Sequence, residues 1–174
     1  MSETPVHDYI IVGQGLAGSL LAHFLRKRGK KILVIDAFSS SSSSQIAAGL
    51  VHPITGRRLV KTWMADTAFP FAFSFYDELK KETGTSFFQS MPMLEIIANA
   101  KQWKDWTGRK SDPEISDLIG ERIDESKYSA CLHPFLHLVS ILKSGWLNLP
   151  SFLHTIRTQL KNSHQLLEEE FDYE

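Results

Sequence analysis

Three glycines near the N-terminus have the spacing of a nucleotide-binding turn. They are Gly13, Gly15 and Gly18, in the sequence GQGLAG. The first permits a tight turn out of a strand, the second lets the backbone approach a pyrophosphate, and the third lets a helix pack closely on the strand. The N-terminus of that helix offers free N–H groups and the positive end of its dipole to phosphates. The pattern therefore predicts a dinucleotide site.

An acidic residue follows the glycines at the position that such a site needs. Asp36 ends the apolar segment KILVID. A carboxylate at this point accepts the two ribose hydroxyls of an adenosine. It also disfavours NADP, whose 2′-phosphate would meet a negative charge. The signature by itself does not separate FAD from NAD.

The segments around these residues have the periodicities that the motif requires. Residues 9–12, YIIV, are a β-branched apolar run typical of a buried parallel strand. Residues 16–29 have apolar side chains at helical spacing and end in a basic turn at a glycine. Residues 31–36 are a second predicted strand, which completes a strand–helix–strand unit. A chance glycine turn would lack this context.

Six consecutive serines, Ser39 to Ser44, follow the second predicted strand. Such a run is typical of a solvated flexible loop. Hydroxyls also bind phosphate as neutral donors, and a short helix predicted to begin near Gln45 would add its dipole. The residues alone leave both interpretations open.

The rest of the chain alternates between helical and strand patterns. Residues 64–83 are helical, with Pro70 as an interior break, and residues 87–98 are expected to form paired strands. Residues 99–110 form a short helix, and residues 137–149 form a strand, a turn at Gly145 and a strand. A helix over 148–163, with Asn148 as its cap, leads to a strand-like acidic tail.

Bulk properties are those of an ordinary globular protein. The 174 residues carry a formal net charge of -1, which argues against a nucleic-acid partner. The N-terminus lacks a signal-peptide pattern and no apolar run approaches the length of a membrane span, so we expect a cytoplasmic protein with no membrane partner. The single cysteine, Cys131, indicates a reducing compartment and is expected to be a buried, inert thiol.

The N-terminal region resembles the flavin-dependent family that includes D-amino-acid oxidase, glycine oxidase, sarcosine oxidase and the oxidase domain of a tRNA-wobble-uridine modifying enzyme. The resemblance rests on residues 9–36, on the hydroxyl-rich loop and on AAGLVHP, and more moderately on SGWLNLPSFLHTIRTQL. It implies non-covalent FAD, with serine hydroxyls near the pyrophosphate and small residues beside the flavin ring. One departure is Ala37, where many relatives carry a basic residue.

The residues expected at the cofactor come from the two sources. The motif predicts Gly13, Gln14, Gly15, Leu16, Ala17, Gly18 and Asp36, and the resemblance implies Ala37, Ser43, Ser44, Ala47, Ala48, Gly49, Val51 and His52. Catalytic residues are not assigned.

The resemblance implies an α/β fold in which a Rossmann-like FAD-binding domain with a parallel sheet is interrupted by a strand-rich α+β substrate lobe. The expected division is 1–84 and 148–174 for the FAD domain and 85–147 for the lobe, and the whole is expected to be incomplete relative to the family fold. The implied reaction is oxidation of the C–N bond of a small amine or amino acid, with hydride transfer to flavin.

The sequence leaves two other functions open. One is an NAD-dependent dehydrogenase, and the other is a catalytically incomplete dinucleotide-binding module that acts through partners. A homo-oligomer and a completing partner chain are both compatible with the sequence.

Two further groups of side chains have the types and spacing of site residues. Arg57, Arg58 and Lys61 form a basic cluster that would hold a carboxylate or phosphate, or would simply be a solvated turn. His133 and His137 have metal-pair spacing, but a proline lies between them and no third ligand is evident, so we expect no metal.

Overall fold

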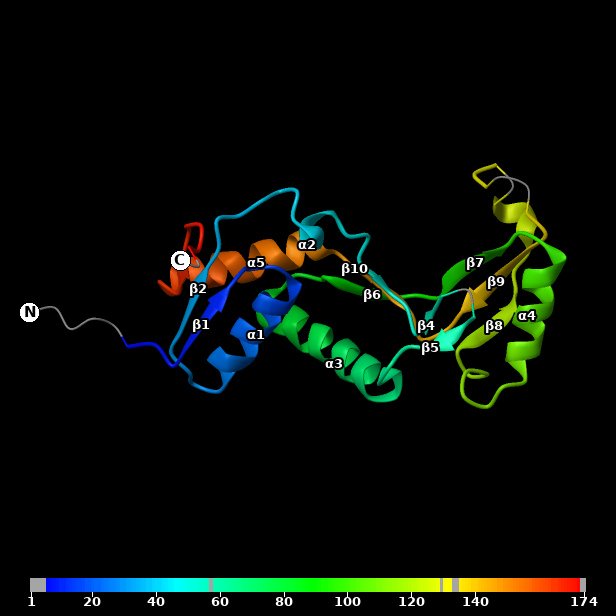
Figure 1. The fold of residues 1–174 in the computed structure, drawn as a ribbon, viewed down its shortest axis with the longest axis horizontal. Coiled ribbons are helices and arrows are strands. Elements are labelled where there is room, and N and C mark those ends of the chain that lie inside the picture. Colours follow the sequence, from blue (N-terminus) through cyan, green and yellow to red (C-terminus); the bar gives the residue numbers. More distant parts are fainter. Residues whose placement is uncertain (1–5, 57, 129, 133–134, 173–174) are drawn as a thin grey trace, which may run out of the picture. The chain divides into compact units, whose positions relative to one another are not determined.

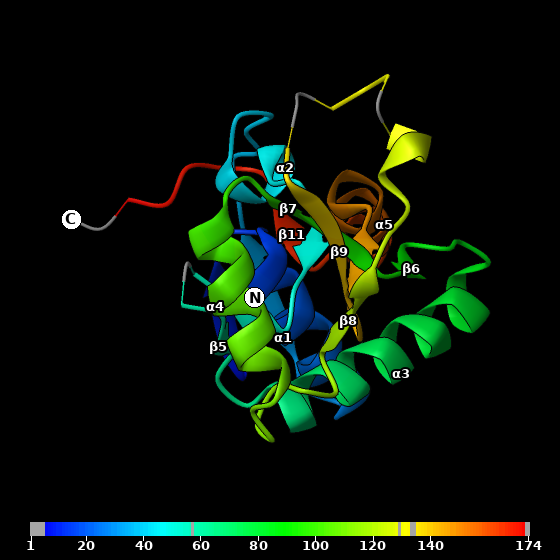
Figure 2. The same cartoon turned by 90° about the vertical axis from the view of Figure 1, so that its right-hand side faces the viewer.

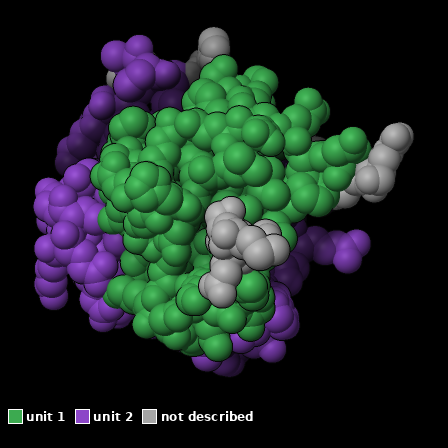
Figure 3. Space-filling view, turned by 90° about the vertical axis from the view of Figure 1, so that its left-hand side faces the viewer, with its two compact units in different colours: residues 1–49, 148–174 green, residues 50–147 purple. Residues whose placement is uncertain are grey.

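The computed structural model describes residues 6–56, 58–128, 130–132 and 135–172. The chain forms two compact units, coloured separately in Figure 3. Unit 1 comprises residues 1–49 and 148–174, and unit 2 comprises residues 50–147. Each unit is described on its own.

Unit 1 is a small parallel sheet with helices. Its elements in chain order are β1 (Tyr9–Val12), α1 (Leu16–Lys27), β2 (Ile32–Ile35), α2 (Ser43–Ile46), α5 (Leu149–Asn162) and β11 (Leu166–Leu167). The strand order is β1-β2-β11, and both pairings are parallel. Helices α1 and α5 pack on each other, as Figure 1 shows.

Helix α5 has clear start signals and a strongly apolar face. The Asn148 side chain accepts a hydrogen bond from Ser151 N at 3.2 Å, and Pro150 lies in the first turn. The face that enters the core is fully or nearly fully buried at Phe152, Leu153, Ile156 and Leu160. Packing of this face fixes α5, and every residue on it, against α1, α2 and β11.

Strand β1 is buried on one face. Ile11 and its register partner Val34 are buried, whereas Ile10 and Val12 are 60% and 43% exposed. The expectation of a buried parallel strand is therefore correct in its parallel pairing and in the burial of Ile11, and wrong for the exposed residues Ile10 and Val12.

Unit 2 is strand-rich, as expected. Its elements are β3 (Leu50–Val51), β4 (Ile54–Thr55), β5 (Val60–Lys61), α3 (Ala65–Thr83), β6 (Phe88–Ser90), β7 (Met93–Ile97), α4 (Ala100–Lys110), β8 (Ile119–Arg122), the 3₁₀ turn η1 (Glu125–Tyr128), β9 (His137–Ile141) and β10 (Gly145–Leu147). Two antiparallel sheets have the orders β3-β10-β6 and β7-β9-β8, and β4 and β5 form a hairpin. Helix α4 packs on β7 (Figure 2).

The core of unit 2 lies between α4 and the β7-β9-β8 sheet. Trp106 and Ile115 are almost completely buried, with Ile97 and Val139 contributed by the sheet. Ile54 reaches the same cluster from the β4–β5 hairpin. The tryptophans of α4 are thus packing residues.

The predicted α/β class, with a parallel sheet and a strand-rich lobe, is confirmed. The predicted domain boundary after residue 84 differs from the boundary between the compact units, which lies after residue 49. Residues 50–84 belong to unit 2 because they contribute β3, which pairs with β10, and α3, which packs on β6. The boundary between residues 147 and 148 is the same in both divisions. Which residues make up each functional domain stays a prediction.

Three local expectations are wrong. Strands β6 and β7 do not pair with each other but belong to different sheets. The turn near Gly145 precedes that glycine, at Lys143 with φ 52°, and Gly145 is the first residue of β10. Cys131 is exposed rather than buried. Among the described residues, no helix has the length and apolar character needed to cross a membrane.

Candidate functional site

The glycine turn joins β1 to α1 with the close approaches that the motif predicts. Gly13 has φ 92°, a conformation that L side chains rarely adopt, and its N–H donates to Ile35 O at 2.8 Å. A Cβ atom on Gly18 would lie 2.0 Å from Gly13 O. Any side chain at Gly18 would therefore push the helix away from the turn.

The serine run returns to this turn. Ser44 Oγ accepts a hydrogen bond from Leu16 N, the first residue of α1, at 3.0 Å. A Cβ atom on Gly15 would lie 2.9 Å from the same oxygen. The last serines thus form part of the walls of the turn, and α2 begins at Ser43, two residues earlier than expected.

A cavity of about 310 Å³ opens between the turn and the serine loop in unit 1. It is lined by Gly13, Gln14, Gly15, Asp36, Ala37, Phe38, Ser39, Ser42, Ser43, Ser44 and Gln45. Seven of the residues predicted at the cofactor are in this lining: Gly13, Gln14, Gly15, Asp36, Ala37, Ser43 and Ser44.

Asp36 is held at the edge of this cavity by three donors. Its Oδ1 accepts from Gln14 N at 2.9 Å, and its Oδ2 accepts from Phe38 N at 3.0 Å and from Arg157 Nη1 at 2.7 Å. Burial raises the pKa of this carboxyl, but the hydrogen bonds from Gln14, Arg157 and Phe38 outweigh burial and hold the pKa below its ordinary value. The carboxylate is therefore ionised at neutral pH.

Two residues of this site carry roles that sequence reasoning missed. Arg157 reaches Asp36 from α5, although it was not among the residues predicted at the cofactor. Gln14 was predicted as part of the turn, but its side chain donates to Ser19 Oγ and Leu153 O and accepts from Arg157. A charged residue on the buried face of a predicted amphipathic helix was the signal that pointed to Arg157.

The other predicted residues lie outside the cavity lining. Leu16, Ala17 and Gly18 form the first turn of α1, and Ala47, Ala48 and Gly49 follow α2. Val51 is in β3 and His52 follows it, both in unit 2. His52 Nδ1 accepts from Ile54 N at 3.2 Å, so this nitrogen has a local partner.

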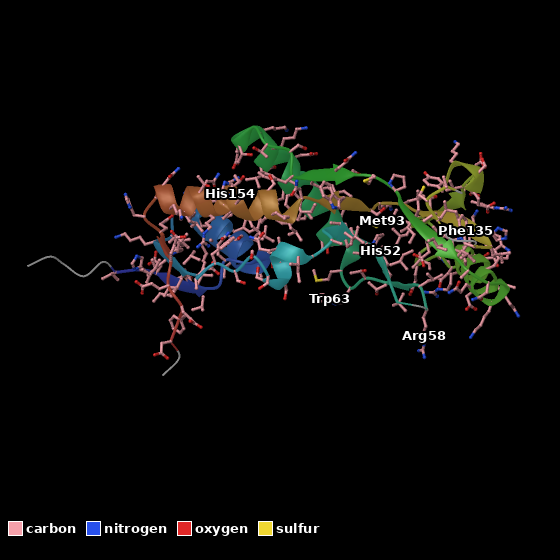
Figure 4. The ribbon with its side chains drawn as sticks, turned by 90° about the horizontal axis from the view of Figure 1, so that it is seen from above. His52, Arg58, Trp63, Met93, Phe135 and His154 are labelled. Atoms are coloured by element: carbon pink, nitrogen blue, oxygen red, sulfur yellow. The ribbon has the colours of Figure 1, made fainter. Side chains whose placement is uncertain are left out.

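The basic cluster is not brought together as one site. Lys61 forms an ion pair with Asp66 at 2.7 Å, whereas Arg58 lines a separate cavity of about 980 Å³ in unit 2, and its side chain extends away from the ribbon (Figure 4). Arg57 lies outside the described residues.

His137, the second histidine of the pair with metal-site spacing, has protein partners of its own. His137 contacts Glu125 at 3.3 Å and stacks edge-on against Trp103. His133 lies outside the described residues, and within the described ones no group of three or more metal-ligating side chains gathers.

Comparison with known proteins identifies the family. Residues 8–166 match the family described as FAD dependent oxidoreductase (DAO). The chain belongs to this family. No curated protein sequence matches it.

Solved structures with the same fold include several oxidases. Glycine oxidase from Bacillus cereus ATCC 14579 has a TM-score of 0.75 at 20% identity, covering 96% of this chain and 48% of its own. Iminodiacetate oxidase from Chelativorans sp. BNC1 has a TM-score of 0.64 at 15% identity, covering 90% and 45%. L-alpha-glycerophosphate oxidase from Mycoplasma pneumoniae, with FAD bound, has a TM-score of 0.62 at 14% identity, covering 94% and 45%.

The chain thus spans less than half the length of these three structures. At these identities the likeness establishes the fold. The family match shows that the chain belongs to the FAD-dependent oxidoreductase family, and neither finding supports the NAD-dependent alternative.

Proposed function

We propose that the chain binds FAD non-covalently at the β1–α1 turn. We also propose that the protein is an oxidoreductase that oxidises the C–N bond of a small amine or amino acid. The observation that carries the first part is the cavity itself. It joins the glycine turn, the serine loop and an ionised Asp36 in one unit. FAD supplies a ring that accepts a hydride from the carbon that bears the amine.

The residues present fit a dinucleotide. At Gly15, where the backbone would approach a diphosphate, a Cβ atom would lie 2.9 Å from Ser44 Oγ, and at Gly18 the missing Cβ lets the helix pack on the turn. The helix that begins at Leu16 has twelve residues, so its first N–H groups and dipole favour an anion. Because Ser44 Oγ accepts the Leu16 N–H, its own O–H is left to donate to a phosphate oxygen.

The remaining predicted residues take roles along the cofactor. Asp36 accepts a hydrogen bond from the ribose. Ala47, Ala48 and Gly49 are small, so the planar flavin can lie against their backbone, and Val51 and His52 are its further neighbours. Gly49 has φ 72°, which makes this backbone path costly for any other residue.

The substrate class rests on relatives whose names are amine and amino-acid oxidases, such as glycine oxidase and iminodiacetate oxidase. One relative of the same fold is a glycerophosphate oxidase. The reaction test therefore includes both chemistries.

The cofactor is tested on the purified chain by its visible absorption spectrum. We expect the absorption bands of oxidised flavin, full release of the flavin on acid precipitation, and an FAD mass for the released molecule. The Gly15→Val variant should be colourless, because its side chain collides with Ser44, while the Gly108→Ala variant, at an open helical position, should stay yellow. A colourless wild type that cannot be reconstituted with FAD would contradict the proposal.

The substrate class is tested by anaerobic bleaching of the flavin in the whole protein. Glycine, sarcosine, alanine of either hand and iminodiacetate form the amine panel, and glycerol 3-phosphate is the competing class. Bleaching by glycerol 3-phosphate alone would overturn the C–N assignment while leaving FAD binding intact.

A further inference from the structure

Arg157 is a buried cation in a helix that otherwise buries apolar side chains. It lies on α5, and its side chain is only 9% exposed. Arginine is almost never buried without partners, since desolvating the guanidinium is costly. Its partners therefore indicate what the position is for.

Both Nη atoms of the guanidinium donate hydrogen bonds, and two of the partner residues, Gln14 and Asp36, line the cavity. Nη1 donates to Gln14 Oε1 at 3.1 Å and to Asp36 Oδ2 at 2.7 Å. Nη2 donates to Asp36 O at 3.3 Å and to Glu168 Oε1 at 2.8 Å. The Phe38 ring, whose residue lines the cavity, lies 5.1 Å from the guanidinium carbon.

The contacts fix both the position and the remaining capacity of the Asp36 carboxylate. A carboxylate has about four acceptor positions. Three are filled by Gln14 N, Phe38 N and Arg157, which leaves about one for a ligand. The expectation that Asp36 accepts both ribose hydroxyls therefore does not fit this arrangement, in which one hydroxyl can be accepted without displacing a donor.

The local charge also depends on Arg157. Glu168 pairs with the guanidinium at 2.8 Å and with Lys161 at 2.7 Å. The two negative charges of Asp36 and Glu168 are thus balanced by the two positive charges of Arg157 and Lys161. Without the arginine, Asp36 would lose its cation beside a site meant for a diphosphate, and the repulsion would act against the ligand.

We propose that Arg157 is a positioning residue for the nucleotide, one that holds Asp36 so that it accepts a single ribose hydroxyl of an adenosine diphosphate. It takes the place of the basic side chain that is absent at Ala37, but it comes from α5 rather than from the residue after the acid. The inference rests on the proposed function, since it assumes that the cavity binds the adenosine half of FAD.

The test compares ADP with 2′,3′-dideoxy-ADP, by calorimetry on the purified chain. In the wild type the missing hydroxyls should weaken binding by at least about tenfold, the effect of a hydrogen bond to a charged acceptor. In Arg157→Met this ratio of dissociation constants should fall clearly below the wild-type ratio, because Asp36 keeps its two main-chain donors but loses the guanidinium that fixes Oδ2. Arg157→Lys keeps the charge without the fork and should give an intermediate ratio.

A merely structural role for Arg157 would weaken both nucleotides equally and leave the ratio unchanged, which would overturn the inference. Arg26→Met is the matched control, since Arg26 also reaches the end of α5, at Ser163, but Ser163 does not line the cavity, whereas the Arg157 partners Gln14 and Asp36 do. Its ratio should equal that of the wild type. If Arg157→Met does not fold, the Arg157→Lys ratio decides, and a wild-type value there overturns the inference.

The same data separate the two proposals. If the wild type binds neither ADP nor FAD, both the proposed function and the inference are refuted. If ADP binds tightly but the ratio of the two dissociation constants is the same in the Arg157 variants as in the wild type, only the inference is refuted.

Discussion

Gly18 faces the carbonyl oxygen of Gly13 across the turn, so its missing side chain is a requirement of contact between backbones. A Cβ atom there would lie 2.0 Å from Gly13 O. Because Gly13 O is a main-chain atom, it cannot rotate away from the added Cβ. We expect Gly18→Ala to lower the free energy of unfolding by about 1–3 kcal/mol, the usual effect of overpacking, and to abolish FAD binding. Denaturant titration of the unfolding transition and the flavin spectrum measure the two effects.

The matched control is Gly108→Ala. Gly108 lies inside α4, and a Cβ atom there meets nothing within 4 Å. Alanine has a higher helix propensity than glycine, so this variant should be more stable by up to about 1 kcal/mol. Equal effects of the two substitutions would show that the approach at Gly18 is not a constraint.

Ser44 caps α1 from outside the helix. Its Oγ satisfies the Leu16 N–H, one of the donors that have no partner within the helix. Ser44→Ala should destabilise the chain by about 1 kcal/mol, as loss of a cap does, and should weaken FAD binding as well. Ser41→Ala is the comparison, since Ser41 is exposed and contacts only its neighbour Ser39 in the hydrogen bonds seen for its side chain.

Thermal unfolding and FAD titration of both serine variants would show the difference. We expect Ser41→Ala to stay within about 0.5 kcal/mol of the wild type, the range of ordinary surface substitutions. Similar losses in both would mean that the serine run acts as a solvated loop and not as part of the turn.

Residue-level prediction from the sequence worked where a role is set by neighbours in the chain. The glycines and Asp36 could be read because a turn and the two strands that flank it are local. Arg157 could not, because its contacts with Gln14 and Asp36 join residues 143 and 121 positions apart. The periodicity of α5 places a charged side chain on the buried face of the helix, but it does not identify Gln14 and Asp36 as the partners.

Helices and strands could likewise be predicted from the sequence where local patterns determine them. The segments that became β1, α1, β2, α3, α4 and α5 follow local patterns of apolar side chains and capping residues. Strand pairing in unit 2 does not, since β6 and β7 are adjacent in sequence and yet pair with β10 and β9. The short segment between them turns the chain from one sheet to the other, and nothing in an apolar run states which strand lies beside it.

The η1 turn is tied to the β8–β9 strands by one charged side chain. Glu125 accepts two hydrogen bonds from Arg122, each 2.9 Å, and contacts His137 at 3.3 Å. The Arg122 hydrogen bond is the main cause that lowers the pKa of Glu125 to about 2. Because the folded pKa lies below the ordinary value of 4.5, this contact contributes stability above pH 4.5 that is lost as the pH falls toward 2.

Glu125→Gln should therefore be less stable than the wild type at neutral pH, and the two should converge near pH 2. Urea titrations at a series of pH values would measure the difference in the free energy of unfolding. Arg122→Met should show the same convergence, because it removes the partner that lowers the pKa. A difference between wild type and Glu125→Gln that is constant with pH would contradict the assignment.

At the scale of the whole molecule, the two units carry different spectroscopic reporters. All four tryptophans, Trp63, Trp103, Trp106 and Trp146, are in unit 2, and unit 1 has none. The groups assigned to the adenosine diphosphate, namely the glycine turn, the serine loop, Asp36 and Arg157, are all in unit 1. The nucleotide should therefore stabilise one unit directly, and the other can be followed independently.

We expect ADP to slow hydrogen exchange within residues 9–36 and 149–167, and to leave exchange in unit 2 unchanged. A ligand that binds only the folded form stabilises it by about 2.7 kcal/mol at a concentration 100 times its dissociation constant, so the protection is large enough to measure by mass spectrometry. Tryptophan fluorescence should report the same unfolding midpoint for unit 2 with and without ADP, provided that the units unfold separately. Protection of β7, β8 and β9 in place of β1 and β2 would locate the nucleotide in unit 2 and refute the site at the glycine turn.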